Sequence, residues 1–188
     1  MMRNFTAAIA SLTLLLGSYT ALAQEPDAAP GFWVTPAIAG FGKIHVPPAA
    51  AYKPDAAKTY RVVFSLTRPS KEPGEVNPAL DRVARAVNLY VASGVPLAHL
   101  RFVAVAYGEA TPLALDDAHY RAKFGTANPN LPLIALLRKA GIDVAVCAQA
   151  VAEHHFDYEW VDKSVTIALS ALTTVTSLEH AGYVLMPL

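Results

Sequence analysis

The stretch that decides the fold is LLRKAGIDVAVCAQAV, residues 136–151. A helical pattern ends at Gly141, a residue that commonly terminates helices, and an apolar run follows as far as Cys147. The run is continuous and does not alternate with polar residues, which is typical of a strand covered on both faces. The segment therefore predicts a helix, a turn and a buried strand that ends at the only cysteine of the chain.

The same alternation of helix and strand patterns extends from residue 60 to the C-terminus. Strands are expected at 60–67, 100–107, 142–147, 164–170 and 183–188, and helices at 79–93, 128–141 and 171–182. Strand–helix–strand units of this length form right-handed crossovers and a parallel sheet. The sequence therefore predicts a three-layer α/β domain over residues 59–188, with a mainly parallel sheet of about five strands.

The first 23 residues have the pattern of a secretory signal peptide. One arginine precedes a short apolar core, and small residues lead up to Ala23. The core is shorter than the 18 or more apolar residues that a spanning helix needs. We expect cleavage after Ala23, a periplasmic or secreted protein, and no membrane span after cleavage.

Residues 24–58 are rich in proline, alanine and glycine and follow no helical or strand period. The segment nevertheless carries large apolar side chains, namely Phe32, Trp33, Ile38, Phe41 and Ile44. Freely solvated linkers typically contain few large apolar side chains. We predict an ordered N-terminal arm that lies across the domain or a neighbouring subunit, and a disordered linker is the alternative.

The composition excludes several classes of function. Fifteen basic and 15 acidic residues balance, so no nucleic acid partner is expected. Neither a dinucleotide-binding glycine motif nor a phosphate-binding loop follows a strand, so no organic cofactor is expected. The hydrophobic content of 54% favours a homo-oligomer that covers part of the apolar surface.

The predicted site lies where the strands end, because ligands of open parallel sheets bind at the carboxyl ends of the strands. Six residues are expected on this rim: Cys147 as the reactive residue, with Tyr107, Gly108, Glu109, Gln149 and Arg68 around it. Cys147 has two interpretations, as a buried packing residue or as a thiol at a helix start, where the thiolate is favoured. For Glu109 and Arg68 a solvated surface position is the favoured alternative to a role in the site.

His154 and His155 raise two further interpretations. A zinc site would need more ligands, because there is no second thiol and no H-x-x-x-H spacing, so no metal is expected. A hydrolytic Cys147–His154 pair would need the chain to turn back, since seven residues on a helix span about 10 Å.

In order along the chain, YRVVFSLT (60–67), NLYVASGVPLAHLRFVAVAYGEA (88–110), NPNLPLIALLRKAGIDVAVCAQA (128–150) and HAGYVLMPL (180–188) resemble the DsrE/DsrF-like family. The resemblance implies a compact α/β fold that assembles into trimers or hexamers. It also implies that Cys147 occupies the position at which sulfur-relay members carry a persulfide and pass sulfur to a partner. Two segments depart from the family pattern: Tyr107 stands where many members have histidine, and CAQA (147–150) replaces the C-G-Q-S of exported relatives.

The resulting hypothesis is an exported sulfur-binding or sulfur-transfer protein with a persulfide on Cys147, a sulfurtransferase-like carrier served by a donor or acceptor protein. The alternative is a non-catalytic oligomeric module that binds a small ligand or a partner, with Cys147 buried.

Overall fold

The computed structural model describes residues 30–188, so the predicted signal peptide lies outside the described residues. Five strands form one sheet in the order β4-β3-β2-β1-β5, and every pair is parallel. The strands are β1 (Tyr60–Leu66), β2 (Leu100–Ala106), β3 (Asp143–Cys147), β4 (Thr166–Ala168) and β5 (Val184–Pro187). The helices are α1 (Pro78–Ala92), α2 (Asp117–Phe124), α3 (Leu131–Lys139), α4 (Ala148–Glu153) and α5 (Ala171–His180). The predicted three-layer α/β fold is confirmed.

The helix α1 follows directly from its sequence. The side chain of Asn77 accepts hydrogen bonds from the backbone N–H groups of Ala79 at 2.9 Å and Leu80 at 3.2 Å, and Pro78 occupies the first turn. Leu80, Val83, Ala84 and Val87 are fully buried at helical spacing. The helix therefore packs one apolar stripe against the sheet.

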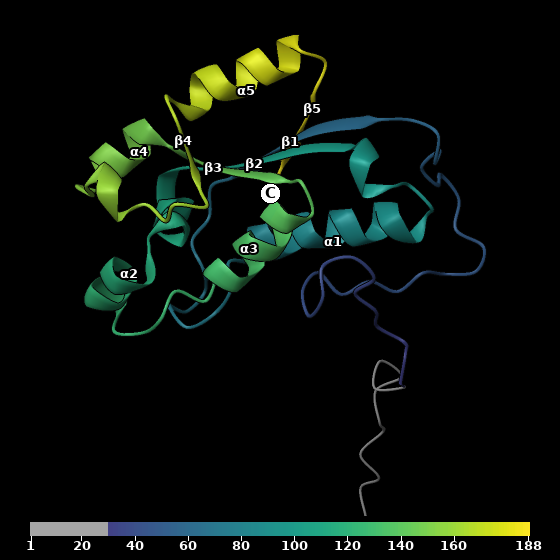
Figure 1. The fold of residues 1–188 in the computed structure, drawn as a ribbon, viewed down its shortest axis with the longest axis horizontal. Coiled ribbons are helices and arrows are strands. Elements are labelled where there is room, and N and C mark those ends of the chain that lie inside the picture. The colour runs from purple at the N-terminus through teal and green to yellow at the C-terminus, as the bar shows by residue number, and fades with distance from the viewer. Residues whose placement is uncertain (1–29) are drawn as a thin grey trace, which may run out of the picture.

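The alternation of side chains along the strands divides the core in two. Val62 and Phe64 of β1 belong to the large core shared with α1 and α3, whereas Val63 belongs to a small cluster beneath α5. Figure 1 shows α1 and α3 on one face of the sheet and α5 on the other. Both faces are covered, as the continuous apolar strands predict, but the α5 layer is thin.

The path of the chain explains why α5 stands alone. The connections through α1 and α3 move stepwise from β1 to β2 and then to β3, whereas α5 returns from β4 at one edge to β5 at the other. A right-handed crossover in the reverse direction places its helix on the opposite face. Within α5 only Ala171 is buried.

The described part of the arm, residues 30–58, packs on α1 and is held by one buried side chain. The amide oxygen of Asn88 accepts hydrogen bonds from the backbone N–H groups of Ala37 and Ile38, both at 2.9 Å. Its amide nitrogen donates to the carbonyl oxygens of Phe41 at 2.9 Å and Gly42 at 3.0 Å. The arm thus satisfies all four hydrogen bonds that the side-chain amide of Asn88 can make, which is why α1 tolerates a fully buried amide.

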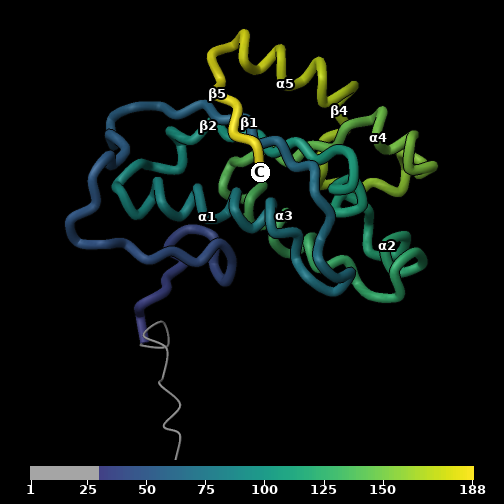
Figure 2. The backbone as a smooth tube through the Cα atoms, turned by 180° about the vertical axis from the view of Figure 1, so that it is seen from behind, coloured from purple at the N-terminus to yellow at the C-terminus, as the bar shows by residue number. Residues whose placement is uncertain are grey.

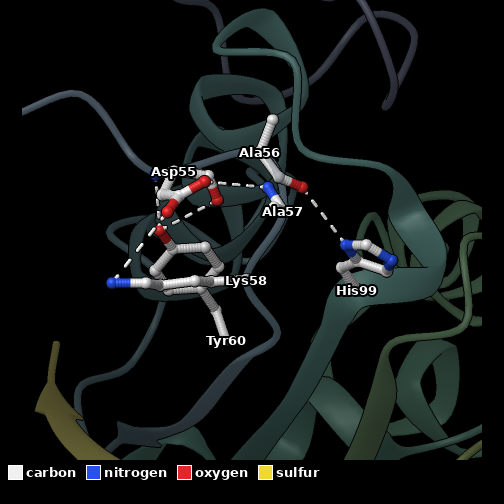
Figure 3. A network of polar contacts seen from close by, with 6 residues as sticks. All are labelled: Asp55, Ala56, Ala57, Lys58, Tyr60 and His99. Carbon is white, nitrogen blue, oxygen red and sulfur yellow. Dashed lines mark hydrogen bonds and ion pairs between the residues drawn. The ribbon is translucent and has the colours of Figure 1, made fainter.

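A second set of contacts ties the end of the arm to the start of the sheet (Figure 3). The backbone N–H of Asp55 donates to the hydroxyl of Tyr60 at 2.7 Å, and the Asp55 carboxylate accepts from the N–H of Ala57 at 2.9 Å. Nδ1 of His99 lies 3.2 Å from the carbonyl oxygen of Ala56. These contacts fix the point at which the irregular arm becomes β1.

Candidate functional site

Cys147 is the last residue of β3 and the residue that immediately precedes α4. Its side chain is only 4% exposed and packs with Val63, Val105, Ala150 and Ala171 in the cluster beneath α5. The position at the carboxyl end of a strand is the predicted one. The burial, however, means that the thiol lies under α5 and not on an open rim.

The thiol receives its hydrogen bond from α5. The backbone N–H of Ala171, in the first turn of that helix, donates to Sγ of Cys147 over 3.2 Å. Ser170 caps the same turn, because its hydroxyl accepts from the N–H of Leu172 at 3.2 Å. Backbone N–H groups at a helix start favour negative charge on a nearby sulfur.

A cavity of about 170 Å³ lies beside this contact. Ala171 both lines the cavity and donates to the thiol. Two hydroxyl groups enter the wall, where Oη of Tyr107 and Oγ of Ser65 share a hydrogen bond of 2.6 Å. The remaining lining residues are Leu172, Val175, Thr176 and Leu185. Thr176 adds a third hydroxyl, which donates to the carbonyl oxygen of Leu172 at 2.8 Å, and the rest of the wall is apolar.

The comparisons with known proteins agree with the fold. The DsrE/DsrF-like family matches residues 60–187, which include every strand and helix of the domain. The chain belongs to the DsrE/DsrF-like family. This family is associated in general with sulfur relay.

Among solved structures, the protein of unknown function MTH1491 from Methanobacterium thermoautotrophicum is similar, with a TM-score of 0.51 and 16% sequence identity. The match covers 69% of this chain and 99% of that one, and at this identity it supports the fold alone. No curated protein matches the chain.

The other predicted residues of this DsrE/DsrF-like protein divide into two groups. Tyr107 packs in the same cluster as Cys147, and Gln149 lies exposed nearby, where its side-chain amide donates to the carbonyl oxygen of Leu169 at 3.1 Å. Glu109 is exposed and lines a different cavity of about 240 Å³. Arg68 is exposed, and only its backbone carbonyl is engaged, by the side chain of Asn77 at 2.8 Å.

Gly108 has a structural task at the end of β2. Its φ of +54° is a left-handed conformation, which glycine adopts without a steric penalty, and it starts the 3₁₀ segment Gly108–Ala114. Its carbonyl oxygen lies 2.9 Å from Nε2 of His154 and accepts from the Thr111 hydroxyl at 2.7 Å. The imidazole of His154 is thus engaged at the C-terminal end of α4, whereas Cys147 precedes the N-terminal end, so the two do not form a hydrolytic pair.

Within residues 30–188, no group of three or more histidine, cysteine, aspartate or glutamate side chains is placed to hold a metal ion. In the same part of the chain, no helix is both long and apolar enough to cross a membrane.

Sequence reasoning missed Ser65 and Ala171 as components of the site. Ser65 had a visible signal, since it is a polar residue inside the apolar strand YRVVFSL, where a buried hydroxyl needs a partner. Ala171 had none, because its contribution is a backbone N–H brought to Cys147 from 24 residues away.

Proposed function

We propose that this DsrE/DsrF-like protein carries sulfane sulfur as a persulfide on Cys147. The observation that carries the proposal is the contact between Sγ of Cys147 and the N–H of Ala171, at the first turn of α5 and beside a small cavity. A persulfide is more acidic and more readily ionised than a thiol, so a helix start is a suitable place for it. Ala171, the donor to Sγ, also lines the cavity, although Cys147 itself does not.

The loading step needs no oxidant or reductant beyond the sulfur donor. Cys147 first loses its proton to solvent, and the thiolate then attacks the outer sulfur of thiosulfate. A new sulfur–sulfur bond forms on Cys147, the bond inside thiosulfate breaks, and its electron pair leaves with sulfite. Delivery is a second exchange of the same kind. An acceptor thiolate attacks the outer sulfur, the bond between that sulfur and Sγ breaks, and its electron pair regenerates the Cys147 thiolate.

Access to the thiol requires the first turn of α5 to move, because Sγ is covered there. The helix is suited to such a movement, since Ala171 is its only buried residue while Leu172 is 81% exposed. Segments with little buried surface open at a low free-energy cost. We infer that loading proceeds through a transient opening of this turn.

We further propose that the protein assembles as a homo-oligomer, a trimer or hexamer, through the apolar surface formed by α5, β5 and the residues that precede α5. Large side chains stand exposed there: Leu169 at 72% and Leu172 at 81% around the start of α5, and Val184 at 65% on the opposite face of the edge strand, in register with Val62. Figure 2 shows β5 alongside β1 at one edge of the sheet, with α5 above it. A second copy that covers this surface would remove it from water.

The proposed setting is outside the cytoplasm, in the periplasm or the medium, where a protein partner would donate or accept the sulfur. The sequence of residues 1–23 is the support for export.

The competing function is a non-catalytic binding module in which Cys147 only packs. The low exposure of Cys147, 4%, favours it. The two functions differ in one measurable property, which is whether the folded protein accepts sulfur at this residue.

The test is the intact mass of the protein after incubation with thiosulfate or polysulfide, recorded beside a Cys147→Ser control. We expect a gain of about 32 Da per sulfur atom in the native protein, removed by a reducing thiol, and no gain in the variant. Equal loading of the variant would refute the proposal, and so would an unmodified native protein whose thiol reacts with iodoacetamide only after unfolding.

A further inference from the structure

A larger cavity, of about 580 Å³, lies at the opposite end of α4 from Cys147. It is within the range of volumes that small-molecule sites occupy. Most of its wall is aromatic or imidazole ring, and the lining residues are Leu115, His119, Ala122, Lys123, His154, His155, Phe156 and Trp160. None of these residues belongs to the cluster around Cys147.

The rings are arranged as two stacked pairs. His119 lies parallel to Trp160, with centroids 4.7 Å apart and an interplanar angle of 12°. His154 lies against Phe156 at 5.3 Å and 24°, and Phe156 in turn lies 6.1 Å from Trp160. Flat ring faces on neighbouring sides of one cavity favour a ligand that is itself flat.

This wall is held rigidly by the backbone around it. The N–H of Asp116 donates to the carbonyl oxygen of Trp160 at 2.8 Å, and Leu115 pairs with Val161 in an antiparallel bridge. Both carboxylate oxygens of Asp116 lie 2.9 Å from Nδ1 of His119, which fixes the plane of that imidazole. The cavity is thus formed before any ligand arrives.

Lys123 brings a positive charge to the lining of the cavity, while the carboxylate of Asp116 contacts the lining residue His119. Nζ of Lys123 lies 5.0 Å from the centroid of the Phe156 ring, and no described carboxylate forms an ion pair with it. No aspartate or glutamate is among the lining residues. A cation that stands over an aromatic wall without a counterion is suited to a ligand with its own negative charge.

We propose that this cavity binds a planar aromatic anion, with its ring system against Trp160 and its carboxylate or sulfonate beside Lys123. The site is separate from Cys147 and its proposed persulfide. Its occupation would thus survive the Cys147→Ser substitution.

The position of Trp160 supplies a site-specific probe. The chain has two tryptophans, Trp33 in the arm and Trp160 in the cavity wall. A full-length protein with Trp33→Phe therefore shows one indole N–H signal in a nitrogen–proton correlation spectrum, that of Trp160. The probe ligand is naphthalene-2-carboxylate, compared with the neutral naphthalene-2-carboxamide and the non-aromatic cyclohexanecarboxylate.

We expect naphthalene-2-carboxylate to shift the Trp160 signal saturably, and the other two compounds to bind at least about tenfold more weakly. Lys123→Met, at an exposed position, removes the charge and should weaken carboxylate binding about tenfold while leaving carboxamide binding unchanged. Lys139→Met, an exposed lysine of α3, is the matched control and should change neither.

Two outcomes overturn the proposal. Equal affinity for the carboxylate and the carboxamide, with no effect of Lys123→Met, would show that the cavity does not select an anion. The absence of any saturable shift of the Trp160 signal at millimolar ligand would show that it is not a site for this class of molecule.

Discussion

Sγ of Cys147 and the backbone nitrogen of Ala171 lie 3.2 Å apart, although 24 residues separate them in the chain. The contact joins the end of β3 to the first turn of α5. Since the same turn covers the thiol, the stability of that turn controls how often Sγ is accessible to a reagent or a sulfur donor. The chemistry of Cys147 and the capping of α5 are therefore coupled.

Ser170→Ala is expected to speed the reaction of Cys147 with iodoacetamide in the folded protein. The substitution removes the hydroxyl that accepts the N–H of Leu172 at the start of α5. Loss of such a cap costs about 1 kcal/mol, which corresponds to an about fivefold larger open population and an about fivefold faster alkylation. The measurement is the alkylation rate under native conditions.

The matched control is Asp116→Ala, which removes the cap of α2 and leaves α5 intact. A local opening of α5 predicts no acceleration in this variant. Equal acceleration in both variants would mean that the thiol becomes accessible through global unfolding, and the gating role of α5 would be wrong.

The fold could be read from the sequence because each strand and helix carries its own local pattern. The run that ends at Cys147, the glycine that precedes it and the stripe on α1 depend only on neighbouring residues. The site could not be read to the same extent. The donor to Sγ is a backbone group of Ala171. The thin packing of α5 depends on which edge of the sheet the chain returns to. Neither feature can be recognised from the local sequence.

The cavity beside α4 was also invisible in the sequence. Histidine, phenylalanine and tryptophan at 119, 154, 156 and 160 have no common spacing, and His119 comes from a different helix. They meet because residues 115 and 161 form a bridge between the segment that precedes α2 and the segment that precedes β4. Only the fold brings these rings together.

Two alanine substitutions in the arm, only two residues apart, are expected to lower the free energy of unfolding by very different amounts. Gly40 and Gly42 both have positive φ, at +82° and +58°. A Cβ at Gly40 would meet nothing within 4 Å, whereas at Gly42 it would lie 2.2 Å from the backbone nitrogen of Arg85 in α1. Gly40→Ala should cost only the backbone strain, about 1 to 2 kcal/mol. Gly42→Ala should detach the arm and cost more than about 3 kcal/mol.

Urea unfolding of the two variants measures the difference, and limited proteolysis reports on the arm directly. Cleavage within residues 37–46 should increase in Gly42→Ala and stay slow in Gly40→Ala. Similar losses of stability in both would contradict the docking of the arm on α1 through this close approach.

The contribution of Asp116 to stability is expected to depend on pH. Partial burial of its carboxylate opposes ionisation, but hydrogen bonds from the backbone N–H and the imidazole of His119 outweigh it and lower the pKa of Asp116 below its ordinary value. A lowered folded-state pKa means that ionised Asp116 stabilises the folded protein above the ordinary aspartate pKa of about 3.9. That stabilisation is lost as the pH falls through the lower folded-state value.

The experiment compares the free energy of unfolding of the native protein and of Asp116→Asn between neutral and acidic pH. The native protein should be more stable by about 1 kcal/mol at pH 7, and the two should converge as the pH falls below about 4. Asp157→Asn, at an exposed position whose side chain makes no cap hydrogen bond, is the control for the loss of one negative charge. A difference for Asp116→Asn that is constant with pH would show that the charge of Asp116 is not what stabilises the fold.

The proposed assembly predicts that a charge on β5 separates the subunits. This strand pairs with β1 on one side, no strand among residues 30–188 pairs with its other side, and Met186 is 45% exposed there. In an oligomer built on this surface, Met186→Lys would bury a charge and forfeit about 1.5 to 3 kcal/mol of apolar burial per subunit. Light scattering should then give the mass of one chain for Met186→Lys and a multiple of it for the native protein.

Leu97→Lys, 37% exposed in the segment before β2 and outside this surface, should leave the mass unchanged. A native protein that is already monomeric at micromolar concentration would refute the assembly, and dissociation by both variants would place the interface elsewhere.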